Sequence, residues 1–341
     1  MRTLLVIRKA EKLKMKSRSV LQVIKTTKKG GKLIKEIGIR DIEAVLILGR
    51  EIYIESSVLS VLSTMNIPIA VIAKDSVGIV MNPVIITYNN YRRLQYNLPK
   101  EEQLEIALEY IKAKLKGMNN ILFYHRRKRI KLEPLPKFNG DIEDYERQIR
   151  AWESVHSAKL WRELVKLLPD DILEELRKKY GFSGRTPKHK DPFNKTLSVM
   201  YAILYSLATK ALISAGLDPT YGFLHRTRYS TPLTFDYTEM FKPVAIHATI
   251  QLIARQGLPE LNKYGELDVE DINKAIKGLY EHLTLRHKDT KKSLYQLIYL
   301  KAFRLTQYLE HKCRKELLAV IYNRHTYRKI REKLRAAPHS S

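Results

Sequence analysis

The chain has 341 residues, 44% of them hydrophobic, which is enough for two domains that each bury a core. Its 62 Lys and Arg residues against 36 Asp and Glu residues leave a net charge of +26, so a polyanionic partner is expected. The only cysteine, Cys313, excludes an intramolecular disulfide and a cysteine-rich zinc site.

The basic residues are spread along the whole chain, which favours nucleic acid over a membrane surface as the partner. The apolar run between Arg2 and Arg8 is too short for a signal-peptide core. Residues 56–73 form the longest uncharged stretch, but Asn66 and Pro68 interrupt it and favour helix, turn and strand over a membrane span. We therefore expect a soluble, cytoplasmic protein without a membrane partner.

Short β-like runs fill the first part of the chain and predict strands. The Gly pair in the segment 28–32 (KKGGK) suits a tight hairpin turn. One short helix is predicted before the last run, with Ser56 or Ser57 as its N-cap. This pattern predicts a small, mainly β domain over residues 1–84 and a linker over residues 85–95.

Helical periodicity replaces the strand pattern after the linker. Pro169 and Gly216 end two of the predicted helices, because proline cannot continue a helix and glycine favours its C-terminal turn. We predict an all-α domain over residues 96–333 and a frayed tail over residues 334–341, so the fold class is α+β. The predicted helices cover residues 100–131, 142–168, 195–215, 235–256, 268–284 and 290–333.

Two acids, Asp236 and Glu239, lie three residues apart in the segment FDYTEMF. If the segment is helical, both carboxylates project from one face, close enough to share a cation. A helix cap at Asp236 and a favourable contact of Glu239 with the helix dipole explain the pair better when nothing else is known. The spacing alone is weak evidence for a metal site.

For His225 and Glu153, too, the sequence leaves open whether the residue is structural or takes part in metal binding or catalysis. His225 ends the turn-rich segment GLDPTYGFLH, which can hold an imidazole as a metal ligand or general base, but a half-buried structural histidine is as common. Glu153 lies beside the apolar face of the helix predicted over residues 142–168. A buried carboxylate there would need a cation or a hydrogen-bond partner, whereas a solvated one would need nothing.

Several blocks between residues 149 and 247 follow one another in an order typical of one known family. By these blocks the chain resembles the CRISPR-associated DNA endonuclease and integrase family, the core enzyme of spacer acquisition. The blocks are IRAWESVHSAKLW, GR and DPFN within residues 184–194, LSVMYAIL, GLDPTYGFLH and LTFDYTEMFKP.

The resemblance implies an all-α catalytic domain in which four residues bind a divalent ion: Glu153, His225, Asp236 and Glu239. It implies that the first three are the catalytic residues and firmest ligands, and that Glu239 is more peripheral. Oxygen donors with one imidazole and no thiolate favour Mg²⁺ or Mn²⁺. In the implied reaction, the 3′-hydroxyl of a short foreign DNA fragment attacks a phosphodiester of a CRISPR repeat array. Water in its place gives endonuclease activity.

The resemblance also implies partners. Double-stranded or branched DNA would be the substrate, and the β domains would pair in a homodimer. A small ferredoxin-like subunit would join this dimer to form the adaptation complex. An exposed edge strand in the β domain would make such pairing possible.

The blocks depart from the family pattern in places. Ser154 and His156 replace small residues, Met200 replaces a common Gly, and His247 replaces a common Asp. None of these changes removes a predicted ligand. His247 nevertheless argues against an accessory acid at its position and suggests a shift in the pH dependence or metal preference of the site.

Two other functions are compatible with the charge. A non-catalytic, basic nucleic-acid-binding scaffold explains the basic composition but not the ordered blocks. An RNA-processing subunit would prefer RNA ligands and would not transfer strands. The basic segments 125–131, 188–190 and 311–315 could hold DNA phosphates, although a charge run is more often a solvated helix face.

Overall fold

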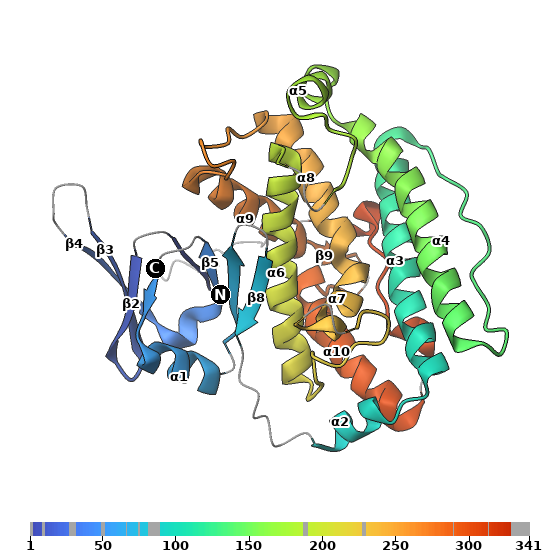
Figure 1. Cartoon of the computed structure of the whole chain (residues 1–341), viewed down its shortest axis with the longest axis horizontal. Coiled ribbons are helices and arrows are strands. Elements are labelled where there is room, and N and C mark those ends of the chain that lie inside the picture. Colours follow the sequence, from blue (N-terminus) through green and yellow to red (C-terminus); the bar gives the residue numbers. More distant parts are fainter. Residues whose placement is uncertain are drawn as a thin grey trace, which may run out of the picture.

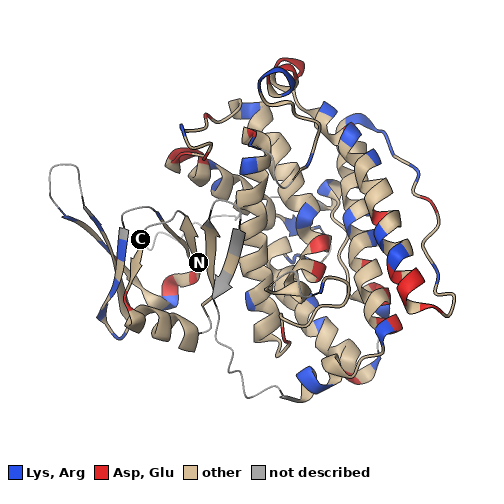
Figure 2. Ribbon diagram, in the orientation of Figure 1, with Lys and Arg blue, Asp and Glu red and all other residues tan. Residues whose placement is uncertain are grey.

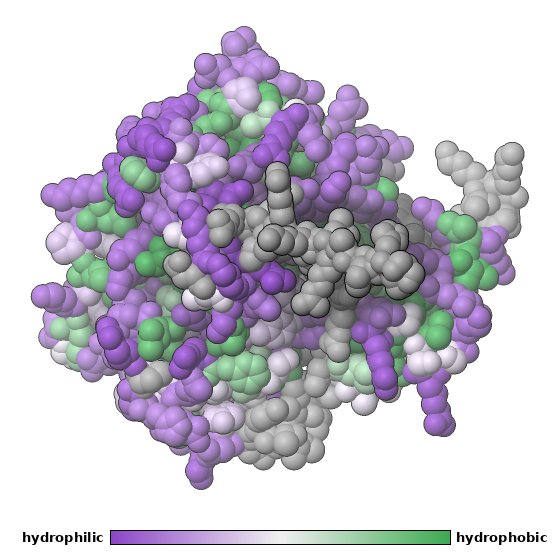
Figure 3. Space-filling view, turned by 180° about the vertical axis from the view of Figure 1, so that it is seen from behind, coloured by the Kyte–Doolittle hydropathy of each residue, from purple (hydrophilic) through white to green (hydrophobic). Residues whose placement is uncertain are grey.

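A computed structural model of the chain shows a small β region beside a larger helical region (Figure 1). It confirms the predicted α+β class, with the strands first and most helices after them. From behind, the surface is mostly hydrophilic with small, scattered hydrophobic areas (Figure 3). The structure describes residues 3–8, 11–26, 32–48, 52–65, 67–73, 76–80, 89–186, 190–226, 230–288, 290–312 and 314–328.

The sheet that lies nearest the helices consists of β1 (Thr3–Ile7), β5 (Ile42–Leu48), β7 (Ile69–Ala73) and β8 (Ser76–Val80), in that order. The strands β1, β5 and β7 are parallel, and β8 runs antiparallel to β7. Alternate side chains of a strand point to opposite faces. Leu46 of β5 therefore packs into the helical core, while Val45 and Ile47 belong to the core of the β region.

The second sheet consists of β4 (Lys32–Gly38), β3 (Val20–Thr26), β2 (Glu11–Ser17) and β6 (Tyr53–Ile54). The antiparallel pairing of β3 with β4 confirms the predicted hairpin, whose turn lies outside the described residues. The predicted short helix is also confirmed as α1 (Ser56–Thr64). Its N-cap is Glu55, which makes no side-chain hydrogen bond there, so the predicted serine cap is wrong.

The helical region is arranged around α6, which lies against β5 and β7 of the first sheet (Figure 1). By length and composition α6 could cross a membrane, but 89% of its most apolar stretch is buried inside the structure, the environment of a core helix. The helices are α2 (Asn89–Tyr96), α3 (Lys100–Arg126), α4 (Ile142–Leu164), α5 (Asp170–Tyr180), α6 (Pro192–Ser214), α7 (Pro232–Thr238), α8 (Lys242–Gln256), α9 (Val269–Leu283) and α10 (Leu294–His311).

Two predicted helices end earlier than their periodicity suggested. The helix predicted over 100–131 ends at Arg126, because Arg127 adopts a left-handed conformation with φ 53°. The helix predicted over 290–333 ends at His311, where Lys312 has φ 51°. Beyond it, the short strand β10 (Tyr327–Arg328) pairs antiparallel with β9 (Arg286–His287).

A third predicted helix, over residues 235–256, is broken into α7, a 3₁₀ turn over Glu239–Phe241, and α8. Pro243 lies in the first turn of α8, where its missing N–H group is tolerated. Residues 170–180 form the helix α5, which was not predicted. Residues 89–95 of the predicted linker lie in α2.

A buried ion pair joins the two regions of the molecule. The Nζ atom of Lys210 on α6 lies 3.1 Å from Oε1 of Glu43 on β5 and donates a hydrogen bond of 3.0 Å to the Glu43 carbonyl. The hydroxyl of Tyr299 on α10 donates to the same carboxylate. Burial alone would raise the pKa of Glu43, but the Tyr299 hydrogen bond and the Lys210 charge outweigh it and lower the pKa. Glu43 is therefore an anion that ties β5 to two helices.

Candidate functional site

The predicted residue Glu153 lies in the middle of α4, on the side that packs against α3. Its Oε1 atom accepts a hydrogen bond from the ammonium group of Lys114, a buried residue of α3. The same ammonium nitrogen lies 2.7 Å from Oε2 of Glu239, in the 3₁₀ turn after α7. Carboxylates from two separate elements thus converge on one positive charge.

Glu239 is almost completely buried, with 3% of its surface exposed. Its Oε1 atom accepts a hydrogen bond from Lys242. Its Oε2 atom pairs electrostatically with Lys114 but has no partner of hydrogen-bond geometry among the described residues. Burial would raise the pKa of Glu239, but the charges of Lys114 and Lys242 lower the pKa to about 2. Glu239 is therefore ionised at neutral pH.

Asp236 makes a different set of contacts. Its Oδ2 atom accepts hydrogen bonds from the backbone amides of Phe223 at 2.6 Å and Leu224 at 3.0 Å. Its Oδ1 atom accepts from the amide of His225 at 3.0 Å and lies 2.6 Å from the ring atom Nδ1 of His225. Both carboxylate oxygens therefore hold the loop that carries His225.

These contacts determine the tautomer of His225. An ionised carboxylate only accepts hydrogen bonds, so Nδ1 of His225 carries the proton that Asp236 receives. The other ring nitrogen, Nε2, then has the lone pair. A histidine whose Nδ1–H is held by a carboxylate is the usual arrangement of an imidazole metal ligand. About 18% of the His225 side chain is exposed, so the ring is reachable from solvent.

The structure thus brings the four predicted residues together as two pairs. Lys114 joins Glu153 to Glu239, and Asp236 binds His225. The two pairs are neighbours because Asp236 lies in α7 and Glu239 lies three residues later, in the 3₁₀ turn. Within the described part of the chain, no three His, Cys, Asp or Glu side chains form a ready-made metal-binding group. Lys114 lies between the two glutamates instead. Hard carboxylate oxygens that already converge on a cation fit Mg²⁺ or Mn²⁺.

Lys114 and Lys242 were not predicted as site residues. Lys114 is one of three alternating lysines in KAKLK, and only its 7% exposure separates it from its neighbours. Lys242 follows Glu239 by three residues, a spacing that would have predicted an ion pair. The buried Lys114 and the half-buried Lys242 thus balance the charges of Glu153 and Glu239.

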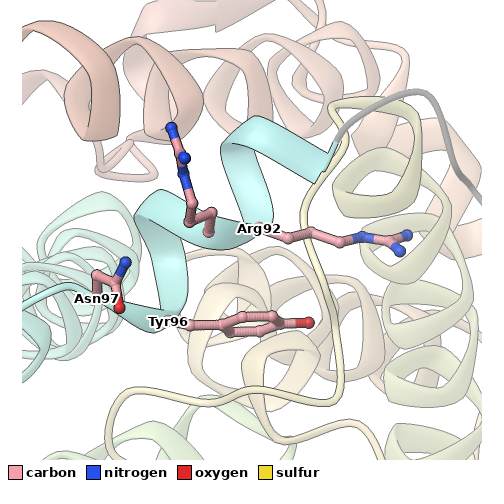
Figure 4. Close-up of a pocket in the computed structure, with 4 residues that line it drawn as sticks. Arg92, Tyr96 and Asn97 are labelled. Atoms are coloured by element: carbon pink, nitrogen blue, oxygen red, sulfur yellow. The ribbon is translucent and has the colours of Figure 1, made fainter.

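Side chains of α2 hold the loop that carries His225 by hydrogen bonds. The side-chain amide of Gln95 donates to the carbonyls of Asp218 and Tyr221, both at 2.9 Å, and its oxygen accepts from the amide of Asp218. The hydroxyl of Tyr96 donates to Asp218 at 2.5 Å. Arg92 and Tyr96 extend from α2 toward the same side in Figure 4, and they line a cavity of about 350 Å³ with Arg93 and Asn97.

His247, which replaces an aspartate common in the family, lies in a hydrogen-bond network apart from the four predicted ligands. Its Nδ1 atom lies 2.8 Å from the hydroxyl of Tyr322, and its Nε2 atom lies 2.8 Å from Nε2 of His125. Burial and the charge of His282 keep the pKa of His247 well below its usual value. His247 is thus a neutral core residue of α8.

Comparison with known proteins places this geometry in context. The family model described as CRISPR associated protein Cas1 matches residues 4–268. A CRISPR-associated endonuclease Cas1 2 of Saccharolobus solfataricus is 34% identical over 178 residues, which cover 50% of this chain and 54% of that relative. A protein with the same description from Pyrobaculum aerophilum is 28% identical over 233 residues, 66% of this chain and 77% of the relative.

Solved structures share the fold. A casposase bound to integration product superimposes with a TM-score of 0.75 at 21% identity, over 95% of both chains. A CAS1 protein from Thermotoga maritima gives a TM-score of 0.72 at 19% identity, over 91% of this chain and 97% of the other. A Cas6-RT-Cas1–Cas2 complex gives 0.70 at 19% identity, over 94% of this chain and 36% of the other.

Proposed function

The chain belongs to the CRISPR-associated Cas1 family, and on that premise we propose that it is a divalent-metal-dependent DNA endonuclease and integrase. In this proposal it inserts short foreign DNA fragments into a CRISPR repeat array by attack of a 3′-hydroxyl on a phosphodiester. One observation supports a metal-dependent reaction at this site. Two glutamates from separate elements converge on one cationic point beside a histidine that a buried aspartate orients.

We infer that Glu153, Glu239 and Nε2 of His225 hold the ion, and that Asp236 acts through His225. Asp236 already uses both oxygens on the loop, whereas Oε2 of Glu239 lacks a hydrogen bond among the described residues. Glu239 is therefore a more direct ligand than its sequence position suggests. A bound Mg²⁺ or Mn²⁺ would polarise the scissile phosphate and stabilise charge on the attacking and leaving oxygens.

Lys114 and Lys242 contribute to the same site. Lys114 is buried and Lys242 is half-buried, and the glutamates that they contact stabilise their ionised forms. With an ion held by the glutamates, the ammonium groups of Lys114 and Lys242 would attract phosphate oxygens of the DNA. The low local dielectric strengthens that attraction.

DNA is the proposed substrate, in double-stranded or branched form. The net charge of +26 supports a polyanion, and the similarity to a casposase bound to integration product supports strand transfer. A homodimer formed through the β regions and a small ferredoxin-like adaptation subunit are further proposals. The similarity to the Cas1 part of a Cas6-RT-Cas1–Cas2 complex supports a partner of that kind.

A strand-transfer assay tests the proposal directly. Defined DNA fragments with a 3′-hydroxyl are incubated with a repeat-bearing plasmid and Mn²⁺, using the wild type and His225→Ala. We expect joined product from the wild type, a loss of at least about 100-fold in His225→Ala, and equal DNA binding by both. Equal activity of the two proteins would contradict the assigned site. Binding without any cleavage or joining by the wild type would favour the non-catalytic scaffold.

A further inference from the structure

A second cationic cavity lies at the far end of α4, between that helix and α5. Its volume is about 540 Å³. Apolar side chains form part of its wall: Ile130, Val165, Leu173 and Phe182. Four cations and a single acid, Glu163, complete the lining together with Ser183. The cations are Lys159, Arg162, Lys166 and Arg177.

The one acid of this cavity is already neutralised. Glu163 accepts hydrogen bonds of 2.7 Å from both Lys128 and Lys166, which lower its pKa to about 2. Among the described residues, no acidic side chain pairs with Lys159, Arg162 or Arg177. Arg162, Lys166 and Arg177 are exposed to solvent, so they are free to attract a polyanion, and several cations on one surface do so more strongly than one.

The spacing of the cations matches a phosphate backbone. Lys159, Arg162 and Lys166 are three and four residues apart, so they follow one face of α4 and its terminal turn. Seven residues of helix rise by about 10 Å. That distance is about the rise of three phosphate-to-phosphate steps in one DNA strand. Basic residues of the segment after α3 continue the positive surface next to α4 (Figure 2).

This surface is separate from the metal centre. Glu153 and Arg162 are nine residues apart on α4, which is two and a half helical turns. The two side chains therefore project from opposite sides of the helix. DNA that occupies the cavity cannot at the same point reach the glutamates.

We propose that this cavity is a second DNA-binding site, which takes the phosphodiester backbone of duplex DNA outside the reacting region. The inference rests on the proposed function, because it takes DNA as the polyanion. It gives the chain two contacts with DNA on opposite sides of α4, one at the reacting phosphodiester and one on the flanking duplex. The second contact recognises charge and backbone spacing rather than base sequence.

The test compares two double variants that each remove two positive charges. Lys159→Gln/Arg162→Gln removes two cavity cations, while Lys178→Gln/Lys179→Gln removes two exposed lysines of α5 that pair with Glu174 and Glu175. Affinity for a labelled DNA duplex is measured by fluorescence anisotropy across a salt series in EDTA. For the cavity variant we expect the slope of log affinity against log salt to fall by about 1.8, or 0.9 for each lost phosphate contact. The control should keep the wild-type slope.

Equal slopes for the two double variants would overturn the proposal, as would a loss confined to an RNA duplex of the same length. Lys159→Arg/Arg162→Lys should restore the wild-type slope, and thermal unfolding checks that each variant is folded. Binding in EDTA does not depend on the metal centre. A wild type that binds DNA but never cleaves it would therefore refute the proposed function and leave this site standing.

Discussion

Asp236 accepts hydrogen bonds from three consecutive backbone amides and from the ring of His225, so a change at Asp236 acts first on the loop. Glu239 makes no such loop contacts and instead faces Lys114 and Lys242. We therefore expect replacements of Asp236 and Glu239 to have different effects on metal affinity and cleavage.

We expect Asp236→Asn to lower Mn²⁺ affinity and cleavage by about 10- to 100-fold, because the amide nitrogen cannot accept the hydrogen bonds that orient His225. Excess Mn²⁺ should restore much of the activity, since the ligands themselves remain. Calorimetric Mn²⁺ titration and cleavage of branched DNA measure the two effects. Glu239→Gln is the matched variant and should resist rescue. Rescue of Glu239→Gln but not of Asp236→Asn would reverse the roles assigned to the two acids.

The sequence identified these candidate residues but could not distinguish their roles. A spacing of three residues predicts that Asp236 and Glu239 share a helix face, and the resemblance attaches a metal to both. The contacts of Asp236 reach back 11 to 13 residues to a loop whose path depends on tertiary packing. Lys114 lies 39 residues before Glu153, and no local pattern links two residues across that separation.

At the scale of elements, the loop before α7 depends on a glycine. A Cβ atom at Gly222 would lie 2.3 Å from the carbonyl oxygen of His225 and 2.6 Å from Cβ of Pro232. Contacts this close force backbone to move, because neither neighbour is the flexible end of a side chain. Gly222 thus allows the loop to fold tightly over Asp236.

We expect Gly222→Ala to shift His225 away from Asp236 and to reduce strand transfer by at least about tenfold. The free energy of unfolding should fall by about 1 to 3 kcal/mol, the usual cost of overpacking. Urea unfolding and the strand-transfer assay measure both. Gly78→Ala on β8 is the control, because no atom lies within 4 Å of its added Cβ among the described residues. If Gly222→Ala behaves like Gly78→Ala, the loop does not need the close approach.

Helix boundaries were the least predictable part of the fold. Apolar periodicity located the cores of α3, α4, α6, α9 and α10, because burial of one face sets that period. It could not find where α3 and α10 end, since residues Arg127 and Lys312 are good helix formers that adopt left-handed conformations.

At the scale of the whole molecule, a cluster of neutral histidines links α3, α8 and α9. His282 lies 3.2 Å from the hydroxyl of Tyr322, which also contacts His247. Burial, together with the charges of Arg324 and Arg255, lowers the pKa of His282 to about 3. The pKa of His125 is also lowered, mainly by burial. The folded protein therefore resists protonation at positions where the unfolded chain accepts protons.

These lowered pKa values predict acid sensitivity. The unfolded histidines bind protons near pH 6.5 and the folded ones only at lower pH, so stability is complete above pH 6.5 and falls as the pH drops toward 3. We expect a loss of about 1.4 kcal/mol per pH unit for each of His247 and His282. Below pH 4.5, Glu239 adds a further loss until about pH 2. Urea unfolding between pH 7 and pH 4 measures the slope, which His282→Gln should flatten. An unchanged slope would show that His282 does not titrate with unfolding.

The pairing of Lys114 and Lys242 with Glu239 has a consequence for the order of events in the cell. Domains held together by structural zinc remain unfolded until the metal arrives. Here the buried acids are already balanced by ammonium groups of the chain itself. Under the proposed function, folding and metal loading would therefore be separate steps. The polypeptide would reach its final shape during metal scarcity and would become active when the supply returned.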